Sequence, residues 1–212
     1  MQERSVDPKL LVARGYDRIA EGFHLRQQQT PPSGVKRGYL DRLTEELQPG
    51  ARILDLGCGA GVPSTEYLIE RFDVVGVDIS QGQLSLARRH VPEATFFLAD
   101  MCSLAFKPRS FDAIVAFYSI IHIPREEHEP LMGRLFDWLR PGGRLVAVMG
   151  RDDWEGRESD WLGLGAEMYW SHFDAATSLA LVGRAGFRPL LSKVEPDPFD
   201  GGHLFVLAER PS

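Results

Sequence analysis

The sequence predicts an α/β protein with a doubly wound, mostly parallel sheet and helices on both faces. Strand-like and helix-like segments alternate from Ile53 to Met149 at the rhythm of βαβ units. The strand-like segments are rich in Val, Ile, Leu and Phe along their whole length, which is typical of parallel strands covered by helices. Because crossovers between parallel strands are right-handed, this alternation winds into one open sheet. We expect a single domain over residues 1–212.

The first part of the chain supplies five helices and four strands of this pattern. Amphipathic helices are expected over 8–22 and 35–47, with a flexible connection at 27–34 between them. The first four strands are expected over 51–57, 74–80, 94–100 and 111–119. The helices that follow these strands are expected over 64–72, 81–90 and 125–140.

The last part of the chain ends in a hairpin rather than another parallel crossover. Residues 141–143, Pro-Gly-Gly, are expected to break the chain before a fifth strand over 144–150. Residues 151–172 are charged and rich in tryptophan and glycine, and we expect them to be irregular. A helix from residue 174 ends at Gly186. Two final strands are expected over 187–195 and 201–210.

Composition narrows the class of protein. Apolar residues make up 43% and charged residues 25% of the chain, as in soluble globular proteins. The net charge is −6 and no Lys- or Arg-rich run occurs, which argues against nucleic acid as a partner. Cys58 and Cys102 are too few for a disulfide framework, and no metal-ligand spacing is present, so we expect no metal. Without a signal peptide or an apolar run long enough to span a membrane, we expect a cytoplasmic protein with no membrane partner.

The predicted sheet also predicts where a ligand binds. Ligands of open parallel sheets lie outside the carboxyl ends of the strands. The glycine turn after the first strand has the spacing G-x-G-x-G, with Val62 where a dinucleotide fingerprint has its third glycine. Asp55, beside the turn, disfavours a pyrophosphate and favours a ligand with a positive charge. Asp78 ends the second strand, where a carboxylate can accept hydrogen bonds from ribose hydroxyls.

At this point the chain resembles a known family. The stretches that carry the resemblance are DLGCGAG (55–61), VVGVDIS (74–80), FFLADM (96–101), FDAIVAFYSIIHI (111–123) and LRPGGRLVAV (139–148). In this order they resemble the class I S-adenosylmethionine-dependent methyltransferases of small molecules, over residues 35–212. The resemblance implies a seven-stranded sheet of order 3-2-1-4-5-7-6, with strand seven antiparallel. It also implies S-adenosylmethionine as the cofactor.

The family motifs imply contacts to the methionine part of this cofactor. Asp55 and the backbone of Gly57 and Gly59 would meet the methionine part, and the carbonyl of Phe117 would accept from its ammonium group. Tyr16, in the stretch YDRIAEGF, looks like a lid tyrosine that closes over the cofactor in this family. Packing of Tyr16 within its helix is the alternative.

The resemblance implies a second set of contacts, to the adenosine part. Asp78 would hold the ribose, and Ile79 would pack on the adenine. Asp100 would bond the adenine amino group, with Met101 against the ring.

Methyl transfer to the acceptor requires few catalytic groups from the protein. A methyl group on a sulfonium is already activated, so most acceleration can come from orientation, and a base matters only if the acceptor loses a proton. The histidine candidates for this base are His122, His172 and His203, with His122 favoured because it follows the fourth strand. Tyr118 is the candidate for an orienting hydroxyl. A helix-capping or loop role for His122 is the alternative.

The acceptor pocket is expected from segments outside the motifs. We expect residues 1–34 to form a helical lid and residues 151–172 an acceptor-side insertion, with the loop after Ile121 between them. Rings in the insertion can line a pocket for an apolar or planar molecule, or form a satellite core. The residues concerned are Trp154, Trp161, Met168, Tyr169 and Trp170.

The predicted function is methyl transfer from S-adenosylmethionine to a small-molecule acceptor. The sequence identifies neither the acceptor nor its O, N or C nucleophile. A non-catalytic S-adenosylmethionine-binding protein on the same fold and a nicotinamide-dependent oxidoreductase are the alternatives. Whether the protein is a homodimer stays open.

Overall fold

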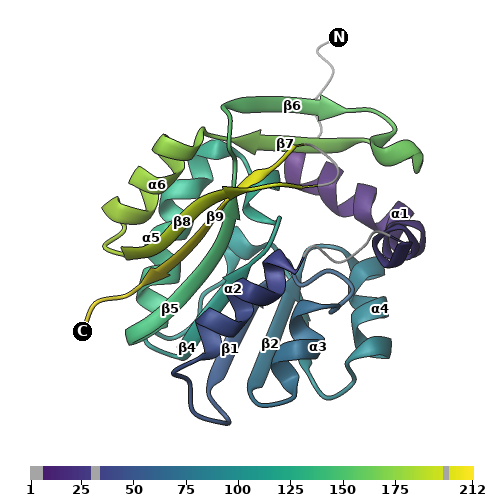
Figure 1. The fold of residues 1–212 in the computed structure, drawn as a ribbon. Coiled ribbons are helices and arrows are strands. Elements are labelled where there is room, and N and C mark those ends of the chain that lie inside the picture. Colours follow the sequence, from purple (N-terminus) through teal and green to yellow (C-terminus); the bar gives the residue numbers. More distant parts are fainter. Residues whose placement is uncertain (1–6, 30–33, 198–200) are drawn as a thin grey trace.

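A computed structural model describes residues 7–29, 34–197 and 201–212, and its main feature is a seven-stranded sheet (Figure 1). The strand order is β3-β2-β1-β4-β5-β9-β8. The first five of these strands in the chain pair in parallel, while β9 is antiparallel to both β5 and β8. Counted along the chain, this is the predicted order 3-2-1-4-5-7-6 with an antiparallel last strand, so the predicted fold is confirmed. The bounds are β1 Arg52–Leu56, β2 Asp73–Asp78, β3 Thr95–Leu98, β4 Phe111–Ala116, β5 Leu139–Met149, β8 Arg188–Glu195 and β9 His203–Glu209.

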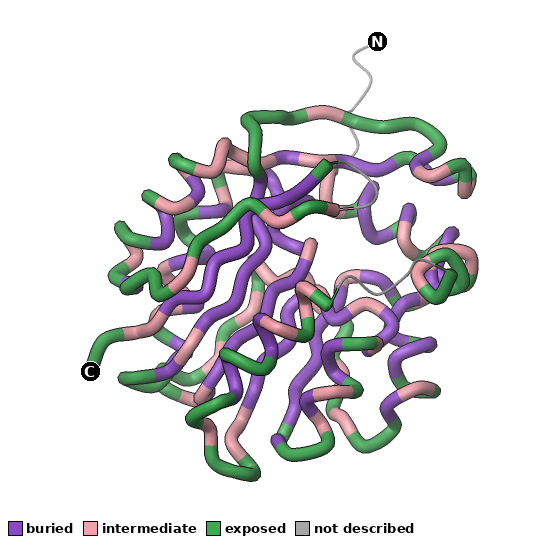
Figure 2. Tube along the Cα trace, viewed as in Figure 1, coloured by how far each residue is buried: buried purple, intermediate pink, exposed green. Residues whose placement is uncertain are grey.

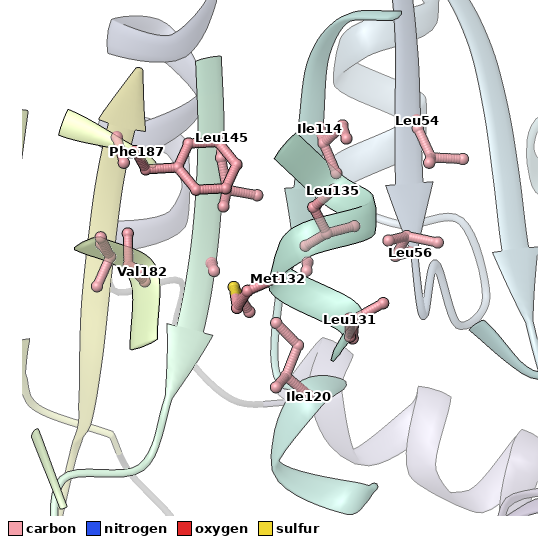
Figure 3. Close-up of a cluster of buried hydrophobic side chains, with 14 of the residues drawn as sticks. Leu54, Leu56, Ile114, Ile120, Leu131, Met132, Leu135, Leu145, Val182 and Phe187 are labelled. Atoms are coloured by element: carbon pink, nitrogen blue, oxygen red, sulfur yellow. The ribbon is translucent and has the colours of Figure 1, made fainter. Parts of the chain in front are cut away.

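The central strands are buried on both faces, as their apolar composition predicts (Figure 2). Successive side chains of a strand point to opposite faces, so Leu54 and Leu56 enter one core and Ile53 the other. On the first face, α5 (His128–Trp138) and α6 (Ala175–Arg184) contribute Leu135 and Val182 (Figure 3). On the second face lie α2 (Val35–Thr44) and α3 (Ser64–Ile69). The predicted helices on both faces are therefore present.

Two helices cover the carboxyl edge and the flank of the sheet. The helix α4 (Gln81–His90) has the predicted bounds and begins with Ser80, whose hydroxyl accepts from the amide of Gln83. The helix α1 (Pro8–Gln29) packs against α4 and continues through the glutamines that were expected to belong to a flexible connection. Glutamine is a good helix former, which explains the extension. The rest of that connection, residues 30–33, lies outside the described residues.

Two expectations about local structure are wrong. The segment 151–172 contains an antiparallel hairpin, β6 (Trp154–Glu158) with β7 (Met168–His172), and is not irregular. Its charged, tryptophan-rich sequence does not reveal the strand pair because β6 is mostly exposed and β7 mostly buried, so neither strand alternates clearly between apolar and polar residues. The Pro-Gly-Gly at 141–143 does not precede the fifth strand but lies within β5, as an irregularity between the pairs Phe111–Leu139 and Ala113–Arg144.

The hairpin and α1 together form a cover over the carboxyl ends of the central strands (Figure 1). β7 contacts both α1 and the 3-10 turn Ile120–His122, which follows β4. Among the described residues, no helix is long and apolar enough to cross a membrane.

Candidate active site

A cavity of about 1570 Å³ lies between the carboxyl ends of the strands and the cover formed by α1 and the β6–β7 hairpin. The structure brings to its wall every residue predicted to bind the cofactor, together with the favoured acceptor-side residues Tyr118 and His122. Those residues are Tyr16, Asp55, Gly57, Gly59, Asp78, Ile79, Asp100, Met101, Phe117, Tyr118 and His122. They come from α1 and from the ends of four different strands, which the sheet order places side by side.

The glycine turn after β1 requires glycine for steric reasons. Gly57 has φ 71°, and a Cβ on it would collide with the Cβ of Ser119, which follows β4. Ser119 is itself held there by a 2.8 Å hydrogen bond from its hydroxyl to the carbonyl of Leu56. The turn therefore lets the end of β4 approach the end of β1 closely.

The amides of this turn already have acceptors inside the protein. Gly57 and Cys58 donate to the carbonyl of Val77, and Gly61 donates to the carbonyl of Cys58. Gly59 donates to the carboxylate of Asp78 at 2.8 Å. A phosphate cradle needs backbone amides that point at the ligand. These amides are engaged elsewhere, so the turn is poorly suited to a pyrophosphate.

Two carboxylates lie side by side in the floor of the cavity, on the neighbouring strands β1 and β2. Asp55 is 2% exposed and accepts from the hydroxyl of Thr65 at 2.7 Å. Asp78 accepts from the amides of Gly59 and Ser80, both at 2.8 Å. Burial raises the pKa of each carboxyl to about 6. Asp55 thus lies buried in the floor of the cavity, and the pair favours a positively charged ligand.

The orientation of Asp78 suits its predicted partner. Each of its two oxygens accepts one of these backbone hydrogen bonds, which fixes the carboxylate, and each oxygen has a second lone pair. The N-cap of α4 is Ser80 and not Asp78, so the carboxylate of Asp78 is not used to cap this helix.

Asp100 has partners that the sequence did not reveal. It accepts from the amide of Cys102 at 2.8 Å, and its other oxygen pairs with the ammonium of Lys9 at 2.7 Å. Lys9 lies in α1 and also pairs with Glu127 at 2.8 Å. Burial alone would raise the pKa of Asp100, but these bonds hold it below its usual value. Met101 follows at the cavity wall, in a 3-10 turn that Asp100 caps.

His122 and Tyr16 meet across the cavity. The Nδ1 of His122 lies 2.8 Å from the carbonyl of Tyr169, which can only accept, so Nδ1 carries the proton. The Nε2 lies 2.9 Å from the hydroxyl of Tyr16 and accepts from it. Burial lowers the pKa of His122 to about 4, so its ring is neutral near pH 7. The contact joins α1, β7 and the end of β4.

Rings from α1 and the hairpin surround this pair. The ring of Trp170 lies 4.2 Å from that of His122, and Trp161 lies edge-on to Tyr16 at 5.8 Å. Trp154 also lines the cavity. Two residues expected there do not line it: Met168 is buried beneath α1, and Tyr169 donates its hydroxyl to Glu155 at 2.6 Å.

The remaining candidates for the acceptor side, Tyr118, His172 and His203, also line the cavity. Tyr118 has φ 53°, a strained conformation for a residue with a side chain, and His203 lies edge-on to its ring at 5.1 Å. His172 bonds the carbonyl of Asp152 at 2.7 Å. Strain of this kind is concentrated at functional sites, which singles out Tyr118.

Sequence reasoning missed a contact that places α1. Asp17 accepts from the hydroxyl of Ser80 at 2.7 Å and from the amide of Gly82 at 2.8 Å, so α1 caps the first turn of α4. The only signal in the sequence was an acid beside Tyr16. Its partners are more than 60 residues away, so no local pattern could identify them.

Comparison with known proteins agrees with this geometry. Residues 53–143 match the family model described as "Methyltransferase domain". A trans-aconitate 2-methyltransferase of Variovorax paradoxus is 42% identical over 106 residues, which cover 49% of this chain and 40% of that protein. Across the curated relatives found, the matched part spans between 21% and 54% of their length.

Solved structures share the fold at low identity. One is a Burkholderia thailandensis 1,6-didemethyltoxoflavin-N1-methyltransferase with bound 1,6-didemethyltoxoflavin and S-adenosylhomocysteine. Its TM-score is 0.71 at 20% sequence identity, and the alignment covers 100% of this chain and 93% of that protein. The [4+2]-cyclase SpnF has a TM-score of 0.74 at 17% identity, covering 97% and 96%. At these low identities, the similarity shows a shared fold and nothing about the reaction.

Proposed function

We propose that this chain, which carries a class I S-adenosylmethionine-dependent methyltransferase domain, transfers a methyl group from S-adenosylmethionine to a small-molecule acceptor. The match over residues 53–143 confirms the family resemblance seen in the sequence. The observation that carries the proposal is the pair of buried carboxylates, Asp55 and Asp78, beside a glycine turn whose amides are occupied. A cationic nucleoside of an amino acid, without phosphate, fits such a floor.

We assign the methionine end of the cofactor to the end of β1. Asp55 and the carbonyl of Phe117 would hold the ammonium group, and the close turn at Gly57 and Gly59 lets the chain approach. When bound, this cofactor supplies a methyl group activated by a sulfonium centre.

The adenosine end is assigned to β2 and β3. Asp78 would accept from the ribose hydroxyls with its remaining lone pairs, and Ile79 and Met101 would pack against the adenine. Asp100 would accept from the adenine amino group through Oδ1, which among the described residues accepts only the amide of Cys102.

The acceptor is assigned to the side of the cavity covered by α1 and the hairpin. If the acceptor loses a proton, Nε2 of His122 is the base, and it is reached through the hydroxyl of Tyr16. The carbonyl of Tyr169 fixes the tautomer that leaves Nε2 as an acceptor. Tyr118 would orient the acceptor through its hydroxyl. Tyr16 would then act as both lid residue and proton path.

The wider organisation belongs to the same proposal. We infer that residues 1–34 act as a lid and residues 151–172 as the acceptor-side insertion of one domain, since the described parts of both line the cavity. A small molecule is favoured over nucleic acid as the methyl acceptor because the chain has 30 acidic residues and only 24 basic residues. A cytoplasmic location and a possible homodimer stay predictions.

The occupied amides of the glycine turn argue against a nicotinamide-dependent oxidoreductase. An experiment distinguishes a methyltransferase from a protein that binds S-adenosylmethionine without turnover. Purified protein is incubated with methyl-labelled S-adenosylmethionine and a panel of small carboxylic acids, amines, phenols and quinols. Labelled product from one class supports the proposal. Thermal stabilisation by S-adenosylhomocysteine with no product from any class would favour the non-catalytic binder. Stabilisation by NAD(H) or NADP(H) alone would overturn the proposal.

A further inference from the structure

Five rings form a closed circuit on the side of the cavity that we assign to the acceptor. They belong to Tyr16 and Phe23 of α1, His122 of the turn after β4, Trp161, and Trp170 of β7. Neighbouring ring centres around this circuit lie between 4.2 and 5.7 Å apart. All five residues line the cavity, and Tyr16, Phe23 and Trp170 keep part of their surface exposed. The ring circuit is therefore a wall of the cavity as well as a packing cluster under α1, and it favours a planar apolar ligand.

The hydroxyl of Tyr16 has a fixed hydrogen-bond direction within this wall. The carbonyl of Tyr169 accepts the proton of Nδ1 of His122 at 2.8 Å, so Nε2 of the neutral ring carries a lone pair. The hydroxyl of Tyr16, 2.9 Å away, therefore donates its hydrogen to Nε2. A charged imidazole would reverse this direction, but His122 is buried and no carboxylate of the described residues bonds its ring. The oxygen of Tyr16 can consequently accept a hydrogen bond from a ligand but has no hydrogen left to donate.

This direction selects among the chemical classes of methyl acceptor. A carboxylate has only lone pairs, so it would set two hydrogen-bond acceptors against each other at the oxygen of Tyr16. A primary ammonium brings three donors, whereas the rings of Phe23, Trp161 and Trp170 contain no acceptor atom and would leave donors unpaired. A hydroxyl on a planar molecule brings one donor and an apolar body. It matches both the single acceptor and the ring circuit around it.

We propose that the methyl acceptor is a phenol or an enol whose hydroxyl donates to the oxygen of Tyr16. This inference rests on the proposed function and adds the acceptor class and its nucleophilic atom. The acceptor oxygen forms the bond to the methyl carbon with one of its electron pairs, as the bond from sulfur to that carbon breaks and leaves its electrons on sulfur. The acceptor proton passes to the oxygen of Tyr16, and the Tyr16 proton passes to Nε2 of His122. The positive charge lost at sulfur reappears on the imidazole, so the net charge of the buried site is unchanged.

Three ligands with the same rings and different polar groups test this class. They are 2-naphthol, 2-naphthoate and 2-naphthylmethylamine, which carry a hydroxyl, a carboxylate and an ammonium. Each is titrated by calorimetry into protein saturated with S-adenosylhomocysteine. We expect 2-naphthol to bind at least about tenfold more tightly than the other two ligands. With methyl-labelled S-adenosylmethionine, 2-naphthol should give a methyl ether, and 2-naphthoate should give no methyl ester.

Two variants test the hydrogen-bond direction itself. Tyr16→Phe keeps the ring and removes the oxygen, so the affinity for 2-naphthol should fall by about tenfold. His122→Phe keeps a ring in the circuit and frees the hydrogen of Tyr16, so the affinity for 2-naphthoate should rise by about tenfold. A residue with only a packing role would not produce this gain. Tyr39→Phe, at a buried tyrosine that does not line the cavity, is the matched control and should change no affinity.

The outcomes separate this inference from the proposed function. The inference is overturned if 2-naphthoate or 2-naphthylmethylamine binds wild type as tightly as 2-naphthol, if 2-naphthoate is methylated, or if none of the three binds. It is also overturned if Tyr16→Phe keeps the wild-type preference while retaining the wild-type melting temperature. If wild type and Tyr39→Phe fail to bind S-adenosylhomocysteine, or if 2-naphthol binds with the expected preference and no compound is methylated, the proposed function fails instead.

Discussion

The two halves of the cavity are built in different ways. The floor consists of strand ends, and its geometry follows from backbone constraints such as the positive φ of Gly57 and the amides that fix Asp78. The cover consists of α1 and the β6–β7 hairpin, and it is held by side chains that meet across long stretches of sequence, such as Tyr16 and His122. The fold therefore determines the half that we assign to the methyl donor, while individual long-range contacts determine the half that we assign to the acceptor.

The comparison predicts that the most damaging change lies in the floor. Gly57→Ala should lower the free energy of unfolding by about 3 kcal/mol, because the new Cβ meets Ser119 and φ stays positive. Gly50→Ala is the matched control, since Gly50 has φ 79° and open space around it. It should cost about 1 kcal/mol in urea denaturation. Equal losses in both variants would show that the close approach at Gly57 is unimportant.

A change in the cover should affect turnover rather than cofactor binding. His122→Ala should reduce kcat by about 100-fold or more with the acceptor that the methyl-transfer panel identifies. Its affinity for S-adenosylhomocysteine should be retained, because the donor half is intact. Since the pKa of His122 is about 4, the loss should be the same at pH 6 and pH 8. Turnover like that of wild type would return His122 to a structural role.

Asp78 tests the floor directly. Asp78→Ala removes the proposed acceptor of the ribose hydroxyls and should weaken S-adenosylhomocysteine binding by about 1–3 kcal/mol in calorimetry. Asp73→Ala is the control, at the other end of the same strand, where the side chain is exposed. It should bind like wild type, and an unchanged affinity in Asp78→Ala would refute the ribose assignment.

The floor carboxylates also predict a pH dependence. In the free protein the pKa values of Asp55 and Asp78 are raised from 3.8 to about 6, so folding takes up protons there. Their contribution to stability is present below pH 3.8 and is lost as the pH rises through 6. Affinity for S-adenosylhomocysteine should run the other way and rise by about a hundredfold from pH 5 to pH 7, because both carboxylates must be ionised and each contributes about a tenfold change. Calorimetry that finds a constant affinity over this range would contradict the roles of both acids.

Substitutions of two acidic residues in α1, Asp17 and Glu21, should have the smallest effects on stability. Asp17 caps a helix and Glu21 forms a surface ion pair, so the two variants test two kinds of contact in the cover. Asp17→Ala removes a cap from α4 and should cost about 1 kcal/mol of stability. Glu21 pairs with Arg89 on the surface, with both side chains mostly exposed, so Glu21→Ala should cost less than about 0.5 kcal/mol. Thermal unfolding of the two variants measures the difference, and the reverse order would mean that surface charge holds α1.

The same comparison explains what the sequence could predict. The buried strands and the glycine turn follow local patterns, so the strands and the positions of Asp55 and Asp78 could be predicted from them. The sheet order was implied by the family resemblance. The hairpin in 151–172 was missed because its strands mix charged and aromatic residues without clear alternation. Lys9 and Asp17 were missed for another reason. Their partners lie far away in sequence, so a single helical residue carries no local sign of them.

A crystal structure of the complex with S-adenosylhomocysteine tests the division of the cavity most directly. We expect the ribose hydroxyls within hydrogen-bond distance of Asp78 and the adenine between Ile79 and Met101. The sulfur should face an open volume bordered by Tyr16, Tyr118 and His122. A nucleoside bound against the β6–β7 hairpin, away from Asp78, would contradict the assignment of donor and acceptor halves.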